Sequence, residues 1–122
     1  MPIRPHWSLY LLALLFVAAG ILHFVSPQFY LRIMPPWLPA PRLLVQLSGA
    51  AELLGGLGLL LPATRRLAGW GLLLLLLAVF PANLYTVQAH ATLHVPLWAA
   101  WARLPVQPLL MWWVWRVALR RP

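Results

Sequence analysis

The chain has 122 residues, of which 63% are hydrophobic and only 8% are charged, and its mean hydropathy is +0.83. This composition leaves too few polar side chains to cover a water-soluble protein of this size, so it predicts an integral membrane protein in contact with the lipid bilayer. Nine arginines against one acidic residue give a formal charge of +8, but the arginines lie at the ends of apolar segments, which indicates contact with lipid head groups and argues against nucleic-acid binding.

Four apolar segments follow one another along the chain, each near the roughly 17–25 residues that a membrane-spanning helix needs. Proline-containing segments separate them, and proline favours the end of one helix and the start of the next. The predicted helices cover about residues 8–25, 43–61, 67–89 and 104–119. We therefore expect a single domain over residues 1–122 with an all-α fold, a transmembrane four-helix bundle.

The distribution of arginine predicts the orientation of these helices, because Lys and Arg favour the cytoplasmic side in short connections. The first and third connections carry three arginines. The N-terminus, the second connection and the C-terminal end carry six, namely Arg4, Arg65, Arg66, Arg116, Arg120 and Arg121. We expect both termini to be cytoplasmic, in a multi-pass protein of the cell inner membrane.

The single acidic residue, Glu52, lies inside the second apolar segment. A charged side chain at the bilayer centre costs roughly 2.5–3.5 kcal/mol, so such a residue is expected to face a partner or a wet cavity. Two interpretations remain open. Glu52 is either a structural acceptor that binds a nearby Arg or Ser and fixes the helix register, or a catalytic proton acceptor or ligand contact.

Three further polar residues, His23, Asn83 and Gln107, lie at similar depths in the outer halves of the other helices. They predict a cavity open to the outer side, with His23 and Glu52 as candidate catalytic groups and Asn83 and Gln107 as candidate ligand-binding groups. Simpler roles stay open as well. His23 is alternatively a helix-end residue bonded to a carbonyl group, and the two amides are alternatively interhelical hydrogen-bond partners.

The first connection, residues 26–42, is too apolar for an ordinary solvated loop, so we expect it to cover the mouth of the bundle. The third connection, residues 90–103, is expected to form a short amphipathic interfacial helix. Their candidate ligand-binding residues are Arg32, Arg103 and Trp37, with the arginines steering an anionic group.

Metal and haem sites are not expected. The chain has no cysteine, which excludes disulfides, thiolate metal sites and iron–sulfur clusters built from its own residues. His23 and His90 are the residues that could act as axial haem ligands, but only their depth supports that assignment. No compact metal-ligand spacing, nucleophile triad or phosphate-binding loop occurs.

Motifs along nearly the whole chain resemble those of the DoxX-like family of small four-helix integral membrane proteins. The segments that carry the resemblance are residues 20–24, 35–39, 48–52, 80–83 and 103–107, together with Pro27, Phe29, Gly55, Gly56, Pro62, Arg65 and Arg66. The family name comes from subunits associated with thiosulfate:quinone oxidation. The resemblance therefore implies a quinone-linked or redox-partner role.

The leading hypothesis is a redox-associated subunit that binds a quinone or a similar small apolar or anionic ligand in the outer polar cavity. One alternative is a transporter of a small solute or proton. Another is a non-catalytic assembly or scaffold protein that docks through the glycine-rich face of the second helix. Whether the chain is an enzyme, and whether its partner is an oxidoreductase or a second copy of itself, stays open.

Overall fold

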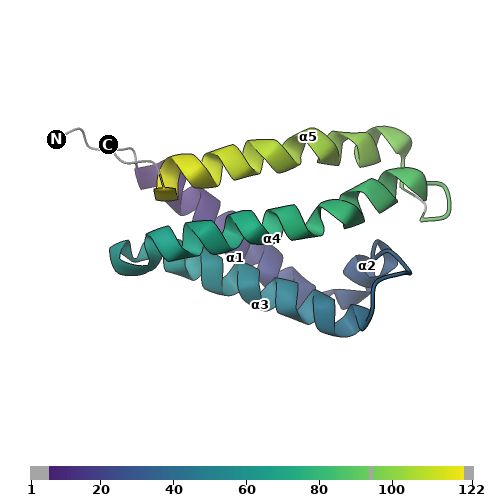
Figure 1. Ribbon diagram of the computed structural model, residues 1–122, viewed down its shortest axis with the longest axis horizontal. Helices are drawn as coiled ribbons and strands as arrows, with labels where there is room; N and C mark the ends of the chain where they lie inside the picture. Colours follow the sequence, from purple (N-terminus) through teal and green to yellow (C-terminus); the bar gives the residue numbers. More distant parts are fainter. Residues whose placement is uncertain (1–5, 94, 120–122) are drawn as a thin grey trace.

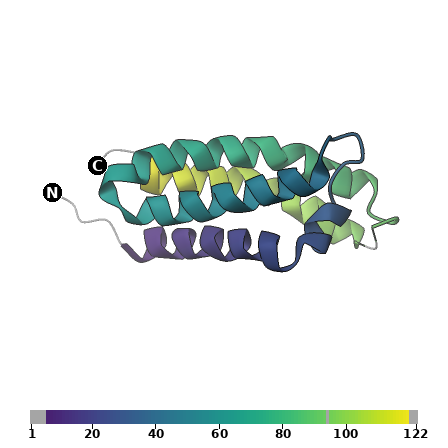
Figure 2. The same ribbon diagram turned by 90° about the horizontal axis from the view of Figure 1, so that it is seen from below.

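A computed structural model describes residues 6–93 and 95–119, and Arg4, His94, Arg120 and Arg121 lie outside these residues. The described chain is all-helical, with long helices that run along the long axis of the molecule (Figures 1 and 2). The elements are α1 (His6–Val25), α2 (Pro27–Arg32), α3 (Pro41–Leu60), α4 (Pro62–Gln88), α5 (Leu97–Val114) and the π-helix η1 (Trp115–Leu119).

The helices begin earlier than the sequence pattern predicts. Both α3 and α4 start with a proline, at Pro41 and Pro62, rather than near residues 43 and 67. A proline is well suited to the first helical position, because the backbone N–H that it lacks has no partner there and its φ angle is already helical. These prolines therefore start the helices, where the sequence pattern had assigned them to connections.

The prediction of a separate interfacial helix in the third connection was wrong. Helix α5 begins at Leu97 and runs without a break to Val114, so residues 97–103 belong to it. Pro105 and Pro108 lie inside α5 and do not end it. Proline is tolerated within helices of membrane proteins because neighbouring groups satisfy the carbonyls that it leaves unpaired.

Three of the described helices are long and apolar enough to cross a membrane. These spans are Trp7–Val25, Pro41–Leu60 and Pro62–Gln88. Many of their leucines face outward, including Leu54, Leu67 and Leu74, with exposed fractions of 71%, 77% and 67%. So many exposed apolar side chains are suited to contact with lipid. This surface suggests that the chain is a membrane protein.

Helices α1 and α3 approach closely through glycines. A methyl group at Gly20 would lie 2.8 Å from the carbonyl oxygen of Gly49, and one at Gly49 would lie 2.6 Å from Cβ of His23. At Gly56 it would lie 2.9 Å from the carbonyl oxygen of Ala13. The glycine-rich face predicted for the second apolar segment is thus occupied by α1 of the same chain, and the close approach brings His23 beside α3.

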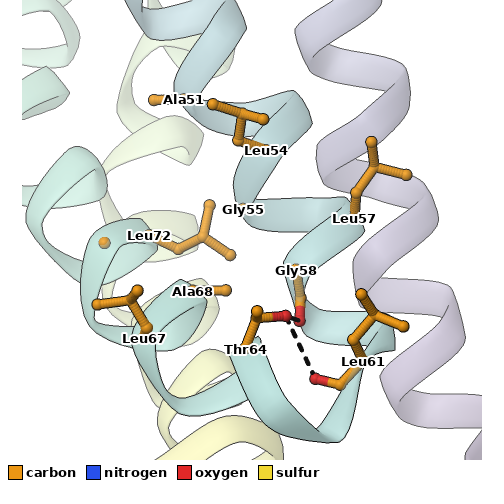
Figure 3. A pocket seen from close by; sticks show the side chains of 11 residues that line it. Ala51, Leu54, Gly55, Leu57, Gly58, Leu61, Thr64, Leu67, Ala68 and Leu72 are labelled. Atoms are coloured by element: carbon orange, nitrogen blue, oxygen red, sulfur yellow. Dashed lines mark hydrogen bonds between the residues drawn. The ribbon is translucent and has the colours of Figure 1, made fainter.

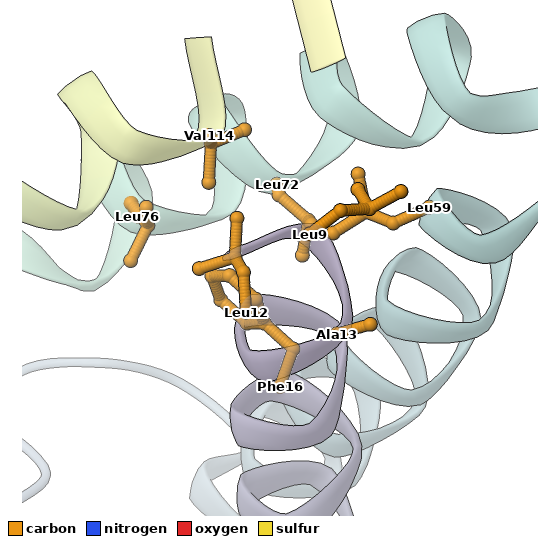
Figure 4. Packing of buried hydrophobic residues seen from close by; sticks show 8 residues of the cluster. All are labelled: Leu9, Leu12, Ala13, Phe16, Leu59, Leu72, Leu76 and Val114. Atoms are coloured by element: carbon orange, nitrogen blue, oxygen red, sulfur yellow. The ribbon is translucent and has the colours of Figure 1, made fainter. Parts of the chain in front are cut away.

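The apolar core lies toward the end of the molecule where α1 begins. Side chains from four helices meet there, and those fully or almost fully buried are Leu9, Leu12, Ala13, Phe16, Leu59, Leu72, Leu76 and Val114 (Figure 4). Trp113 of α5 donates a hydrogen bond to the Ser8 hydroxyl of α1 at this end, with Nε1 and Oγ 2.8 Å apart. Helix α2, which follows the end of α1 and precedes the start of α3, lies at the opposite end (Figure 1).

Candidate functional site

His23 and Glu52 form a close pair between α1 and α3. Nδ1 of His23 lies 3.2 Å from Oε2 of Glu52, and the two side chains are 9% and 15% exposed. The stripe Ala13, Phe16, Gly20 and His23 faces inward along α1, and its glycine lets α3 come close enough for this contact. The only carboxylate side chain of the sequence is therefore largely buried and adjacent to an imidazole.

The hydrogen bonds of this pair are incompletely satisfied. Nδ1 of His23 also lies 2.7 Å from the carbonyl oxygen of Ala19, one turn earlier in α1. That carbonyl can only accept, so the short contact requires a hydrogen on Nδ1 that points toward Ala19. Oε2 of Glu52 is buried and accepts no hydrogen bond from the described residues, despite its distance from Nδ1. A small rotation of the imidazole would transfer the Nδ1 hydrogen bond from Ala19 to Glu52.

Helix α2 covers the pair through Tyr30. The Tyr30 ring stacks on the His23 imidazole with centroids 3.7 Å apart and planes 17° from parallel. Burial raises the pKa of the Tyr30 phenol, the Glu52 carboxylate raises it further, and the Arg103 guanidinium lowers it. The phenol thus senses both charges, and Tyr30 lies between the buried pair and Phe29, whose ring Arg103 approaches.

Asn83 of α4 and Gln107 of α5 form a second polar pair. Nδ2 of Asn83 donates to Oε1 of Gln107 at 2.7 Å, and Nε2 of the buried Gln107 donates to the carbonyl oxygen of Leu76. Pro81 has no N–H to pair with the backbone of the preceding turn, which disturbs the hydrogen bonding of α4 at this point. Gln107 therefore bonds to the turn of α4 that precedes Pro81, and both amides serve as interhelical partners.

A pocket of about 310 Å³ opens between α4 and α5 beside this second pair. Its walls are mainly apolar, with polar groups from Asn83, Gln107 and Arg103 and an indole from Trp98. Ligand pockets in proteins usually range from about 300 to 1,000 Å³ and combine an apolar lining with a few polar groups. This pocket therefore has the size and lining for a small, largely apolar ligand.

Arg103 connects the pocket with the buried pair. Its guanidinium carbon lies 5.6 Å from the centre of the Phe29 ring, which meets the Tyr30 ring edge to face at 5.3 Å. Tyr30 in turn stacks on His23. A continuous series of contacts thus leads from α5 through α2 to α1 and α3, although no hydrogen bond joins the two polar pairs within the described residues.

The remaining predicted site residues occupy different positions. Arg32 lies on α2 with its guanidinium carbon 5.8 Å from the centre of the Phe29 ring. Trp37 is 68% exposed in the segment between α2 and α3 and does not line the α4–α5 pocket. His90 lies beyond the end of α4. No group of three or more His, Cys, Asp or Glu side chains in residues 6–93 and 95–119 is placed to hold a metal ion.

A larger groove of about 470 Å³ runs between α3 and α4, and no residue of the two polar pairs lines it (Figure 3). Leucines and small residues line it, and its hydroxyl, on Thr64, donates to the carbonyl oxygen of Gly58 at 2.8 Å. A groove with so little unused hydrogen-bonding capacity cannot orient a polar ligand. The candidate site is therefore the α2 end of the molecule, despite the smaller volume there.

Two residues of this site, Phe29 and Tyr30, were not predicted as functional. The sequence showed only that their connection is too apolar for a solvated loop. Both belong to a single six-residue helix, α2, and their contacts with His23 and Arg103 depend on how that helix folds back over α1 and α3. The sequence feature that could have indicated them is Tyr30 two residues before Arg32 in an otherwise apolar connection.

Residues 12–118 match the family model described as "Domain of unknown function (DUF8561)". The chain belongs to this family. No curated protein and no solved structure matches the chain. The matched range of the DUF8561 domain contains both polar pairs, α2 and the α4–α5 pocket, so the candidate site lies wholly within the family's domain.

Proposed function

We propose that the chain is a multi-pass protein of the cell inner membrane in which α1, α3, α4 and α5 form a transmembrane four-helix bundle with both termini in the cytoplasm. Three of these helices have the length and hydropathy of a span. Helix α5 packs along α4 and presents Trp98, Trp101 and Trp112 outward, as expected at a membrane interface. The arginine asymmetry supports this orientation.

Because the chain lacks cysteine, single introduced cysteines test this topology without background labelling. Gln28 on α2 and Ala63 at the start of α4 are both exposed and lie at opposite ends of α3. A membrane-impermeant maleimide should label Gln28→Cys in cells with a permeabilised outer envelope and intact inner membrane. It should label Ala63→Cys only after the inner membrane is opened. The reverse pattern would contradict the proposed orientation.

We further propose that the protein is a redox-associated subunit that binds a quinone or a similar small ligand at its outer end. The observation that carries this proposal is the buried His23–Glu52 pair, 3.2 Å apart between apolar helices. Ring contacts of Tyr30 and Phe29 connect this pair with Arg103, which lines the ligand-sized pocket. Quinone reduction consumes protons together with electrons, and an imidazole next to a carboxylate can accept and donate them. His23 and Glu52 would take up the protons that reduction of the bound ligand consumes. Water molecules would carry these protons to the ligand, since no hydrogen bond between the described residues links the pair to the pocket.

The α4–α5 pocket would hold the ligand ring. One N–H of the Asn83 amide is bonded to Gln107, and the second is available to a ligand carbonyl oxygen. Arg103 would bind a second oxygen or an anionic substituent, and the apolar side chains Val106 and Leu110 would contact the ring and its substituents. The resemblance of the sequence motifs to those of DoxX-like proteins is the reason for proposing a redox partner, and the partner enzyme would supply the electrons.

Ligand binding is tested by extracting the protein in a mild detergent and identifying co-purifying quinones by mass spectrometry. Affinity for a short-chain quinone is then measured for wild type, Asn83→Leu and Glu52→Gln. Asn83→Leu should weaken binding about tenfold, because it removes a hydrogen bond inside a mostly apolar pocket. Gln88→Leu, an exposed amide at the end of the same helix, is the matched control and should bind as wild type does.

Glu52→Gln should retain binding and slow proton uptake on reduction of the bound quinone, since the isosteric amide keeps the packing and cannot accept a proton. Absence of any quinone from the purified protein, combined with equal affinities for wild type and Asn83→Leu, would exclude the quinone proposal. Equal rates of proton uptake by wild type and Glu52→Gln would exclude the assigned role of the carboxylate.

A further inference from the structure

A concentration of positive charge surrounds α2. Arg32 and Arg103 approach the same aromatic ring, with guanidinium carbons 5.8 and 5.6 Å from the centre of Phe29. Their charged groups are therefore no further apart than the sum of these two distances. Arg32 belongs to α2 and Arg103 to α5, so two separate helices bring these cations to one ring.

A third arginine lies on the other side of α2. Arg42, in the first turn of α3, lines a small cavity of about 60 Å³ with Pro27 and Leu31 of α2. His23 lines the same cavity. All three arginines of the first and third connections thus gather around one six-residue helix.

The chain has no carboxylate to balance these arginines. Glu52 is the only acidic side chain in the sequence, and it is buried beside His23. Neither Arg32 nor Arg103 forms an ion pair with another of the described residues. Two guanidinium groups on one ring repel each other, and an oxyanion bound between them would turn this repulsion into attraction.

We propose that Arg32 and Arg103, positioned by Phe29, form a binding site for a phosphate group. Guanidinium groups bind phosphate oxygens through paired N–H donors, and stacking on an aromatic ring fixes the plane of those donors. Arg42 adds a third positive charge on the other side of the same short helix. The phosphate belongs either to a lipid head group at the membrane surface or to a free phosphate, and both present the same oxyanion to the site.

This site is distinct from the proposed quinone pocket. Arg32 and Phe29 do not line the α4–α5 pocket, whereas Asn83 and Gln107 do. Arg103 reaches both, so a bound phosphate at the mouth would hold that side chain on α2. The phosphate site therefore does not depend on the quinone proposal. Substitution of Arg32 distinguishes the two, because Arg32 belongs to the phosphate site and does not line the quinone pocket.

The test uses the full-length protein in a maltoside detergent, which carries no phosphate. Native mass spectrometry compares retention of phosphatidylglycerol with retention of diacylglycerol, which has the same chains and no phosphate. A second arm titrates inorganic phosphate and follows its binding by calorimetry. Binding in the first arm alone assigns the site to lipid, whereas binding of inorganic phosphate assigns it to the free ion.

Arg32→Gln and Arg103→Gln are each expected to weaken the phosphate ligand about tenfold or more, because each removes a charge-assisted contact. Phe29→Leu should weaken it by a smaller factor, since both guanidinium groups lose their supporting ring. The matched control is Arg116→Gln, which removes an arginine 5.5 Å from the Trp112 ring at the other end of α5 and should leave binding unchanged.

Equal retention of phosphatidylglycerol and diacylglycerol, with no binding of inorganic phosphate, would overturn the proposal. A loss in Arg116→Gln as large as that in Arg32→Gln would also overturn it, because the effect would then be one of net charge. Thermal unfolding of each variant, compared with wild type, establishes that the variants are folded. Arg32→Lys is a conservative variant that keeps the positive charge and loses the planar pair of N–H donors. It should therefore bind the phosphate ligand more weakly than wild type does.

Discussion

Substitution of Gly20 by alanine tests the close approach of α1 and α3 that brings His23 to Glu52. An added Cβ at Gly20 would lie 2.8 Å from the Gly49 carbonyl oxygen and 2.9 Å from the Leu53 backbone nitrogen. Backbone atoms cannot rotate away as a side chain does, so the two helices must separate. A methyl group at this position is therefore expected to destabilise the packing of α1 against α3.

The expected cost follows from two opposing terms. Overpacking of a well-packed interface typically costs about 1–3 kcal/mol. Replacing glycine by alanine inside a helix recovers about 0.5–1 kcal/mol of helix stability. The clash at Gly20 is with backbone atoms, which places the overpacking cost in the upper half of its range, so we expect Gly20→Ala to lower the free energy of unfolding by about 1–2.5 kcal/mol.

The assay is reversible unfolding in mixed detergent micelles, followed by the fluorescence of the tryptophans. Gly71→Ala is the matched control, because a Cβ at Gly71 would meet no atom within 4 Å. That variant gains helix propensity without a clash, so its stability should equal or exceed that of wild type. A Gly20→Ala protein as stable as wild type, or a Gly71→Ala protein destabilised to the same degree, would refute the packing argument.

Two further predictions concern the polar residues of the α2 end. Burial raises the pKa of the Tyr30 phenol, and the charges of Glu52 and Arg103 act on it in opposite directions, so phenolate absorbance should show a lower pKa in Glu52→Gln and a higher one in Arg103→Gln. The Tyr30 phenol of the unfolded chain ionises at a lower pH than that of the folded chain. The contribution of Tyr30 to stability is therefore present below the ordinary tyrosine pKa and is lost as the pH rises through the pKa of the folded protein. Equal titration curves for wild type, Glu52→Gln and Arg103→Gln would contradict these contacts. Gln107→Leu leaves the Asn83 amide without its partner and should lower the free energy of unfolding by about 1 kcal/mol in the same micelle assay, whereas an unchanged value would show that the interhelical bonds add nothing.

Much of this arrangement could be predicted from local pattern. The spacing of Ala13, Phe16, Gly20 and His23 on one helical face anticipates their burial, and all four lie on the inward side of α1. The cost of a carboxylate in an apolar helix anticipates a partner for Glu52, which the structure supplies as His23. Periodicity and burial cost are properties of single helices, so they can be read from a sequence alone.

Other features depend on contacts between distant segments and escaped prediction. Depth alone suggested one cavity for four polar residues, whereas the helices pair them as His23 with Glu52 and Asn83 with Gln107. The role of Tyr30 follows from the fold of a short connection, which has no periodic signal. Helix starts were misplaced for a local reason, because proline ends one helix and equally well begins the next.

The distance between Glu52 and His23 in the membrane is the most direct test of this account. Glu52 is the only acidic residue, so glutamate labelled with ¹³C at the carboxyl carbon gives one signal from one site. Solid-state NMR in lipid, with ¹⁵N-labelled histidine, should show strong carbon–nitrogen dipolar coupling consistent with the 3.2 Å contact between Oε2 and Nδ1. The coupling should vanish in His23→Gln. A carboxyl signal without coupling to any histidine, or with coupling that survives in His23→Gln, would contradict the buried pair on which the proposed function rests.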